Sequence, residues 1–221
     1  MNTVYIIGKE LRQTAPITVA FLLVYAAMAI FGSAAPERLF ALFAVMASGA
    51  YVISAILIAE RYEERNNGYG YLLRMPVLPG ELAAGKLIQM LLVDVLSCAL
   101  MVSAVRLYGA GPEFQNTAQS IVLLAGTAWL FLILVMYVGI CTLGYTRFVH
   151  VFRISIMALL VLVQVLLMLL LKSGAGGGSG LARLANGISG APWGPICILA
   201  SILYLGSAPW VGAVMRRRAG A

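Results

Sequence analysis

One segment comes close to the nucleotide-binding pattern GxxxxGK[ST], in which backbone amides and a lysine cradle phosphates. It runs from Gly80 to Leu87 with the sequence GELAAGKL. Leu87 stands where the pattern needs a hydroxyl to hold magnesium, no strand precedes the segment, and an apolar run follows it. We therefore expect no ATP or magnesium site in this chain. Any nucleotide-driven work would have to come from another protein.

The other reactive side chains are isolated from one another. His150 is the single histidine, and the three cysteines, Cys98, Cys141 and Cys197, fall inside separate apolar runs. Neither a zinc site nor a catalytic dyad can be assembled from them, so we expect no catalytic residue and no metal site. Asp94 differs, because it is the single carboxylate deep in an apolar run. Ionisable groups are costly there and typically functional; Asp94 could line a translocation path, relay protons or pair locally.

Composition indicates an integral membrane protein. Of the 221 residues, 62% are hydrophobic and 10% are charged, whereas soluble domains have about 45–50% apolar and about 25% charged residues. A helix needs roughly 20 apolar residues to cross a bilayer. The fold class predicted is all-α integral membrane, one transmembrane domain over residues 1–221 with six transmembrane helices. The predicted spans are residues 16–31, 39–59, 82–108, 118–143, 154–171 and 193–215, with a glycine-rich loop over 172–192.

The N-terminal residues allow more than one interpretation. Val4, Ile7 and Leu11 share one helical face, which predicts an amphipathic helix before the first span; the alternative is a frayed polar terminus. A signal peptide cleaved after the small residues 33–35 is a further alternative, and it would remove the first span. In the second span, the small residues Ser48 and Gly49 would let another helix approach closely.

Lysine and arginine predict the orientation of the spans. With the N-terminus inside, the inner segments carry 11 of the 15 basic residues, and cytoplasmic loops are enriched in these residues. Both termini are therefore predicted to be cytoplasmic. The tail Arg216-Arg217-Arg218 is interpreted as an anchor for anionic lipid rather than a nucleic-acid site.

The segment from Glu60 to Lys86 is a long polar interruption between apolar runs. Residues 60–65 have the composition of a helix, and Asn67 and Gly68 are suited to ending one. Residues 69–75 then place aromatic and apolar side chains outside the membrane, which is costly unless something covers them. We interpret this segment as a water-facing docking surface on the cytoplasmic side. The alternative is a helix that rests on lipid.

This segment resembles part of a known family. The pattern Glu60…Asn67-Gly68…Leu72-Leu73-Arg74-Met75-Pro76-Val77…Glu81-Leu82…Lys86 is similar to the loop between the second and third spans of ABC-2 type ABC transporter permeases. The six-span layout and the polar N-terminal helix agree, so the resemblance covers nearly the whole chain. Met75 departs from the leucine usual in the family, and Leu78-Pro79 replaces a polar cap and a basic residue. These departures leave the start of the third span open.

The resemblance implies a permease without its own ATPase. A separate cytosolic ABC ATPase, in two copies, would bind ATP and magnesium, and this chain would bind no cofactor. The resemblance also implies a second permease copy, as homodimer or paralogue, in a plasma membrane of bacterial type. By position, residues 60–74 would form the coupling helix, residues 145–151 a second contact, and residues 4–12 the connecting helix. The residues implied to bind the ATPase are Glu60, Arg61, Glu63, Glu64, Arg65, Asn67, Gly68, Tyr71, Leu72, Leu73, Arg74 and Phe148.

Export is the leading expectation, because the sequence shows no outer segment large enough to accept a delivered binding protein. One alternative is a proton- or ion-coupled secondary transporter or channel that uses Asp94. Another is a membrane scaffold that transports nothing. Broadly apolar spans do not identify a substrate.

Overall fold

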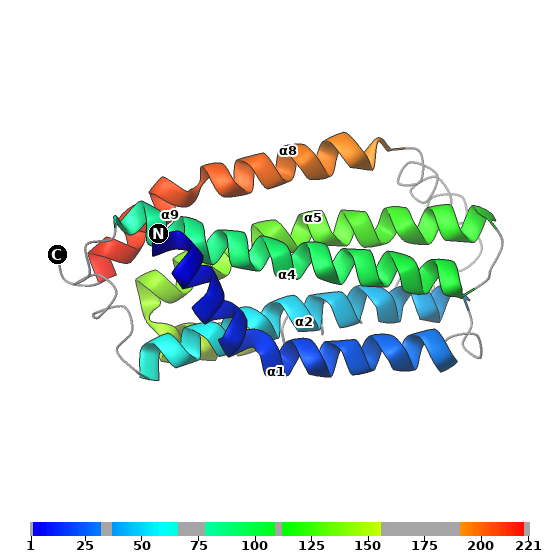
Figure 1. The fold of residues 1–221 in the computed structure, drawn as a ribbon, viewed down its shortest axis with the longest axis horizontal. Helices are drawn as coiled ribbons and strands as arrows, with labels where there is room; N and C mark the ends of the chain where they lie inside the picture. Colours follow the sequence, from blue (N-terminus) through cyan, green and yellow to red (C-terminus); the bar gives the residue numbers. More distant parts are fainter. Residues whose placement is uncertain (1, 32–36, 66–77, 109–111, 156–190, 219–221) are drawn as a thin grey trace.

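The computed structural model describes residues 2–31, 37–65, 78–108, 112–155 and 191–218. The elements in these ranges are helices (Figure 1), namely α1 (Asn2–Phe31), α2 (Glu37–Arg65), α4 (Pro79–Leu107), α5 (Pro112–Leu143), α8 (Trp193–Gly206) and α9 (Ala208–Arg218). A further helix covers residues 145–155. Within the described ranges no strand occurs, and the all-α class is confirmed.

Among the residues that the structure describes, five segments are long and apolar enough to cross a membrane. They are Val4–Phe31, Phe43–Arg65, Pro79–Leu107, Ala118–Leu143 and Trp193–Arg217, which correspond to the predicted first, second, third, fourth and sixth spans. The predicted fifth span, 154–171, lies outside the described residues apart from residues 154 and 155. The same holds for the 172–192 loop apart from residues 191 and 192. The count of six spans therefore stays a prediction.

The first span and the predicted amphipathic helix form one continuous helix, α1. Figure 1 shows that this helix changes direction partway along its length, and Pro16 lies inside it. Proline lacks the backbone N–H and crowds the carbonyl four residues earlier, which is a common cause of helix kinks. Val4 and Leu11 are exposed, whereas Ile6 and Glu10 are buried against other helices. The boundary predicted at residue 16 thus falls inside one continuous helix.

The helices that flank residues 66–77 are longer than the predicted spans. α2 continues to Arg65, which confirms the helical composition predicted for residues 60–65. α4 begins at Pro79, at a helical position that tolerates proline because its N–H would have no partner there. The N–H of Leu78, just before the helix, donates to the Glu81 carboxylate at 3.2 Å. A glutamate in the first turn thus satisfies a backbone donor at the N-terminus of the helix. The third span therefore starts three residues earlier than predicted.

The predicted last span, 193–215, corresponds to the segment Trp193–Arg217, and the structure forms it from two helices rather than one. α8 ends at Gly206 and α9 begins at Ala208. Pro209 has no N–H to donate and its ring would crowd the carbonyl of Leu205, so a straight helix cannot continue through it. Instead, the Ser207 hydroxyl donates to the Tyr204 carbonyl at 2.6 Å, and the Ser207 carbonyl accepts the first bond of α9.

α4 is the central element, because it packs against α1, α2, α5, α8 and α9. Glycines allow several helix pairs to approach closely. A Cβ added at Gly49 of α2 would lie 2.5 Å from the Trp129 ring of α5, and one added at Gly212 of α9 would lie 2.7 Å from the Pro79 carbonyl oxygen. The first contact confirms the close approach predicted from the small residues of the second span.

Four helix ends lie at the same end of the bundle (Figure 1). The start of α1, the end of α2, the start of α4 and the end of α9 all lie there. We call this the polar end, since it carries Arg61, Arg65, Lys86, Arg147 and Arg216. The position of these basic residues at one end agrees with the count of basic residues, which predicts that their segments lie on the same side of the membrane. The side of the membrane that the polar end faces stays a prediction.

Candidate functional site

Charged side chains from three helices meet inside the polar end. The ammonium of Lys86 on α4 donates to Glu10 Oε1 of α1 at 3.0 Å and to Glu60 Oε1 of α2 at 2.8 Å. All three side chains are fully buried. Beside them, Lys9 forms an ion pair with Glu63. We call Glu10, Glu60 and Lys86 the buried ion cluster.

A second polar link runs parallel to this cluster. The Gln89 side chain donates to the Thr14 hydroxyl at 3.3 Å, and that hydroxyl donates to the Glu10 carbonyl at 3.0 Å. Charges removed from water are costly, and the cost is offset only where partners are well placed. These contacts therefore hold the N-terminal part of α1 against the end of α2 and the start of α4. Their role is to set the relative positions of three helices.

Burial separates the residues implied to bind an ATPase into two groups. Glu60 and Glu63 are each 1% exposed, and both are engaged inside the chain by Lys86 and Lys9. The expectation that these two carboxylates lie on a water-facing surface is wrong, because each meets an opposite charge from another helix. Their part in partner binding would have to be indirect.

The remaining implied contacts lie elsewhere. Arg61, Glu64 and Arg65 are exposed at the end of α2. Phe148 is buried: it stacks on Phe152 with ring centroids 5.4 Å apart, and it fills the space beside a glycine of α5. It anchors the 145–155 helix rather than facing outward. The others lie outside the described residues, namely Asn67, Gly68, Tyr71, Leu72, Leu73 and Arg74.

A basic cleft of about 790 Å³ lies between the end of α2 and the 145–155 helix. The chain reverses into this helix at Gly144, whose φ of +79° favours glycine. Arg61, Arg147 and Arg153 line the cleft, and none of the described residues lining it is acidic. Burial raises the pKa of Tyr145 in this cleft, and the positive charges of Arg61 and Arg153 offset part of the rise. The cleft thus presents positive charge at the polar end.

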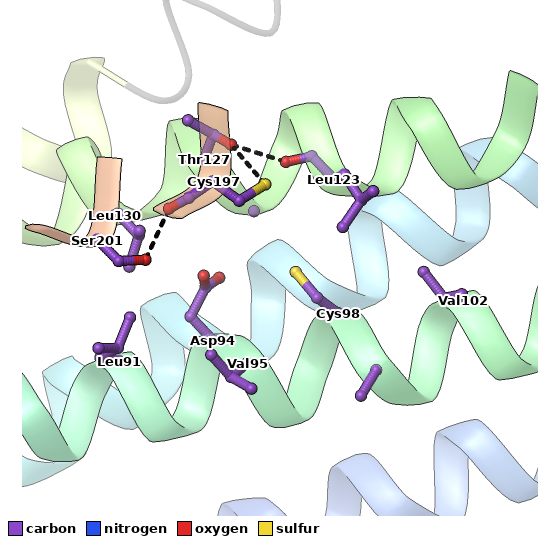
Figure 2. A pocket seen from close by; sticks show the side chains of 12 residues that line it. Leu91, Asp94, Val95, Cys98, Val102, Leu123, Thr127, Leu130, Cys197 and Ser201 are labelled. Atoms are coloured by element: carbon purple, nitrogen blue, oxygen red, sulfur yellow. Dashed lines mark hydrogen bonds between the residues drawn. The ribbon is translucent and has the colours of Figure 1, made fainter. Parts of the chain in front are cut away.

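Asp94 lies in a different place, at the middle of α4, where it faces α5 and α8. It lines a pocket of about 310 Å³ together with residues of all three helices (Figure 2). Asp94 is 4% exposed, and its Oδ1 has no hydrogen-bond partner. The prediction that Asp94 is deep in a span is confirmed. Local pairing, one of the alternatives for this residue, has no support among the described residues.

Side chains from distant parts of the sequence complete this pocket. Thr127 comes from α5, and Cys197 and Ser201 come from α8. Gly126 lies directly opposite the carboxyl: a Cβ there would be 3.6 Å from Asp94 Oδ2 and 2.4 Å from Cys98 Sγ. The apolar lining includes Leu91, Val95, Val102, Leu123 and Leu130. The arrangement suits binding, since no nucleophile is paired with a base.

Metal-binding groups do not gather in the described ranges. No cluster of three or more histidine, cysteine, aspartate or glutamate side chains that could hold an ion occurs among these residues. No disulfide joins Cys98, Cys141 and Cys197. Neither cleft nor pocket offers a ligand set for a metal.

Sequence reasoning missed several residues of both sites. Glu10 and Gln89 were not predicted as site residues, although Lys86, at the edge of an apolar run, needs a carboxylate partner if it is buried. Thr127 and Ser201 had no signal of their own, because single hydroxyl residues are common in membrane helices.

Comparison with protein families identifies the chain's relationship. The family model described as ABC-2 family transporter protein matches residues 5–205. The comparison with individual curated proteins gave no match. The matched region includes α2, α4 and α5, nearly all of α1 and α8, and both the buried ion cluster and the Asp94 pocket. The chain therefore belongs to the ABC-2 family of transporter membrane proteins.

Proposed function

We propose that this chain is the permease subunit of an ABC exporter, paired with a second permease copy and driven by two copies of a separate cytosolic ABC ATPase. The observation that carries the proposal is the family match over residues 5–205. In this proposal ATP and magnesium bind to the ATPase. The near-match to a phosphate loop agrees with it, since Gly80 to Leu87 lacks the hydroxyl that would hold magnesium.

The proposed orientation places the polar end and both termini in the cytoplasm of a cell with a bacterial-type plasma membrane. Its support is the excess of basic residues in the inner segments. Export is supported by the short connections at the opposite end, residues 32–36 and 108–111. Neither connection is long enough to form a domain that receives substrate from outside.

The proposed ATPase contact combines the exposed end of α2, the basic cleft and the predicted 66–74 segment. Arg61 and Arg65 on α2 and Arg147 on the neighbouring helix give this surface positive charge. A complementary surface on the ATPase would therefore be acidic. Glu60 and Glu63 contribute indirectly. Their ion pairs hold α2 against the other helices when the ATPase displaces the end of α2.

Co-purification tests the proposal. The tagged chain is expressed in its native host, where its own ABC ATPase is present, and purified in detergent. We expect the ATPase to be retained and its hydrolysis rate to change in the complex. The double variant Arg61→Glu/Arg65→Glu should weaken retention by about tenfold or more, because it turns attraction into repulsion over part of the surface.

A matched control separates the two parts of this proposal. Arg106→Glu reverses the charge of one arginine at an exposed position at the far end of α4, and retention should be unchanged. If both variants retain the ATPase as well as the wild-type chain does, the assigned contact surface is refuted. If no ABC ATPase associates with the wild-type chain, the proposed function itself fails.

Proton or ion coupling through Asp94 is the competing function. It predicts uptake into vesicles driven by a pH gradient without ATP, and loss of that uptake in Asp94→Asn. The burial of Asp94 agrees with it, but the family match favours ATP-driven transport.

A further inference from the structure

The hydroxyl groups that line the Asp94 pocket donate their hydrogen bonds to backbone carbonyl groups. In Figure 2, the Thr127 hydroxyl donates to the Leu123 carbonyl at 2.9 Å and the Ser201 hydroxyl to the Cys197 carbonyl at 2.8 Å. A hydroxyl has one proton and two lone pairs. The Thr127 oxygen also lies 3.6 Å from Cys197 Sγ, and a thiol that donates there takes one of its two lone pairs. The Thr127 and Ser201 oxygens therefore each keep a lone pair to accept with, alongside the carboxyl oxygens of Asp94. A ligand that donates hydrogen bonds would therefore match the oxygens of this pocket.

The pocket's own lining supplies no positive charge. None of the described residues around it is lysine, arginine or histidine. Lys86 is eight residues away on the same helix, about 12 Å along its axis, and it is engaged by Glu10 and Glu60. An ionised carboxylate that is buried without a partner is costly. A bound cation would remove that cost.

The rest of the lining is hydrocarbon. Leu91 and Val95 of α4 and Leu123 and Leu130 of α5 form apolar walls. A hard metal ion would need about six oxygen ligands, which this lining does not provide. The volume of about 310 Å³ lies at the small end of ligand pockets, which span about 300–1,000 Å³. A small molecule with one cationic donor and an apolar body matches both the acceptor oxygens and the apolar walls of the pocket.

We propose that this pocket binds amphipathic organic ammonium compounds and that they are the substrate class of the transporter, a step that rests on the proposed function. The ammonium group donates to Asp94 and to the Thr127 and Ser201 oxygens. The aryl or alkyl group packs against the leucine and valine walls. Gly126 keeps the space beside the carboxyl open, because a side chain there would enter it.

Binding to the full chain in lipid nanodiscs, without any ATPase, tests the site. The probe is phenylpropylamine, compared with phenylpropanol and phenylpropionate, which share its apolar body but lack its charge or reverse it. Calorimetry should show binding of the amine, with an affinity about tenfold or more above that of the alcohol. The carboxylate should not bind.

Two variants address the pocket directly. Asp94→Asn keeps the size of the side chain and removes its charge, so amine affinity should fall about tenfold or more. Gly126→Ala should weaken binding by narrowing the pocket, whereas Gly8→Ala, with no atom within 4 Å of the new Cβ, is the matched control. Thermal unfolding midpoints identify any variant that has merely lost its fold.

Two results would overturn the binding site: equal affinity for amine and alcohol, or unchanged amine affinity in Asp94→Asn. The substrate role is tested in the complex with the ATPase. There the amine should raise ATP hydrolysis with the wild-type permease and not with Asp94→Asn. Binding without any such effect in a working complex would refute the substrate class alone. Failure of the ATPase to associate would refute the proposed function and leave the binding result standing.

Discussion

Replacing Lys86 with methionine would leave two buried carboxylates without their shared partner. Glu10 and Glu60 each place an oxygen within 3.0 Å of the Lys86 ammonium, and all three side chains are fully buried. Removing one member of a buried ion pair costs about 3–5 kcal/mol. For a protein of this size each kcal/mol lowers the unfolding midpoint by about 2–4 °C. Lys86→Met should therefore lower the midpoint by about 6–20 °C.

The triple variant Glu10→Gln/Glu60→Gln/Lys86→Met distinguishes charge from packing. It keeps similar volumes and removes every charge of the buried ion cluster, and such neutral replacements often cost little or even stabilise. We expect it to recover most of the loss. The midpoint is measured by heating detergent-purified protein and following the folded fraction by size-exclusion chromatography. A single variant as stable as wild type, or a triple variant no more stable than the single one, would show that this electrostatic reasoning is wrong.

Two glycine variants test the packing around α4 and α5, with Gly8→Ala as the common control. Gly49→Ala places a Cβ 2.5 Å from the Trp129 ring, and overpacking of this kind costs about 1–3 kcal/mol, so the unfolding midpoint should fall. Gly212→Ala meets the Pro79 carbonyl oxygen at 2.7 Å; because backbone cannot turn away as a side chain can, its midpoint should fall further. A midpoint equal to that of Gly8→Ala would contradict the corresponding helix contact.

Hydropathy predicted the spans well where apolar residues continue without interruption, as in α4 and α5. It could not find the break between α8 and α9, because the residues on both sides of it are apolar. The signal for this break is Pro209, which has no N–H for a bond to the Leu205 carbonyl. The start predicted for the first span at residue 16 rested on Pro16 as a first-turn residue, and the structure instead has Pro16 inside α1.

The sites were predictable only in part, because charge partners come from distant positions. Asp94 stands out in the sequence, since it is an isolated carboxylate in an apolar run. Its neighbours Thr127 and Ser201 reach it only through the packing of α5 and α8 against α4. Glu60 and Glu63 were expected to face water, because nothing in their local sequence shows that Lys86 and Lys9 meet them inside the bundle.

α4 carries two buried ionisable groups, and the difference between them separates structure from function. Lys86 has its charge satisfied by α1 and α2, so its contribution is to hold three helices together. Asp94 has an oxygen without a partner beside a pocket, an arrangement that stability alone would not favour. In the proposed function, the Lys86 ion pairs would transmit a displacement of the end of α2 to α4. The pocket that Asp94 lines between α4, α5 and α8 would change with it.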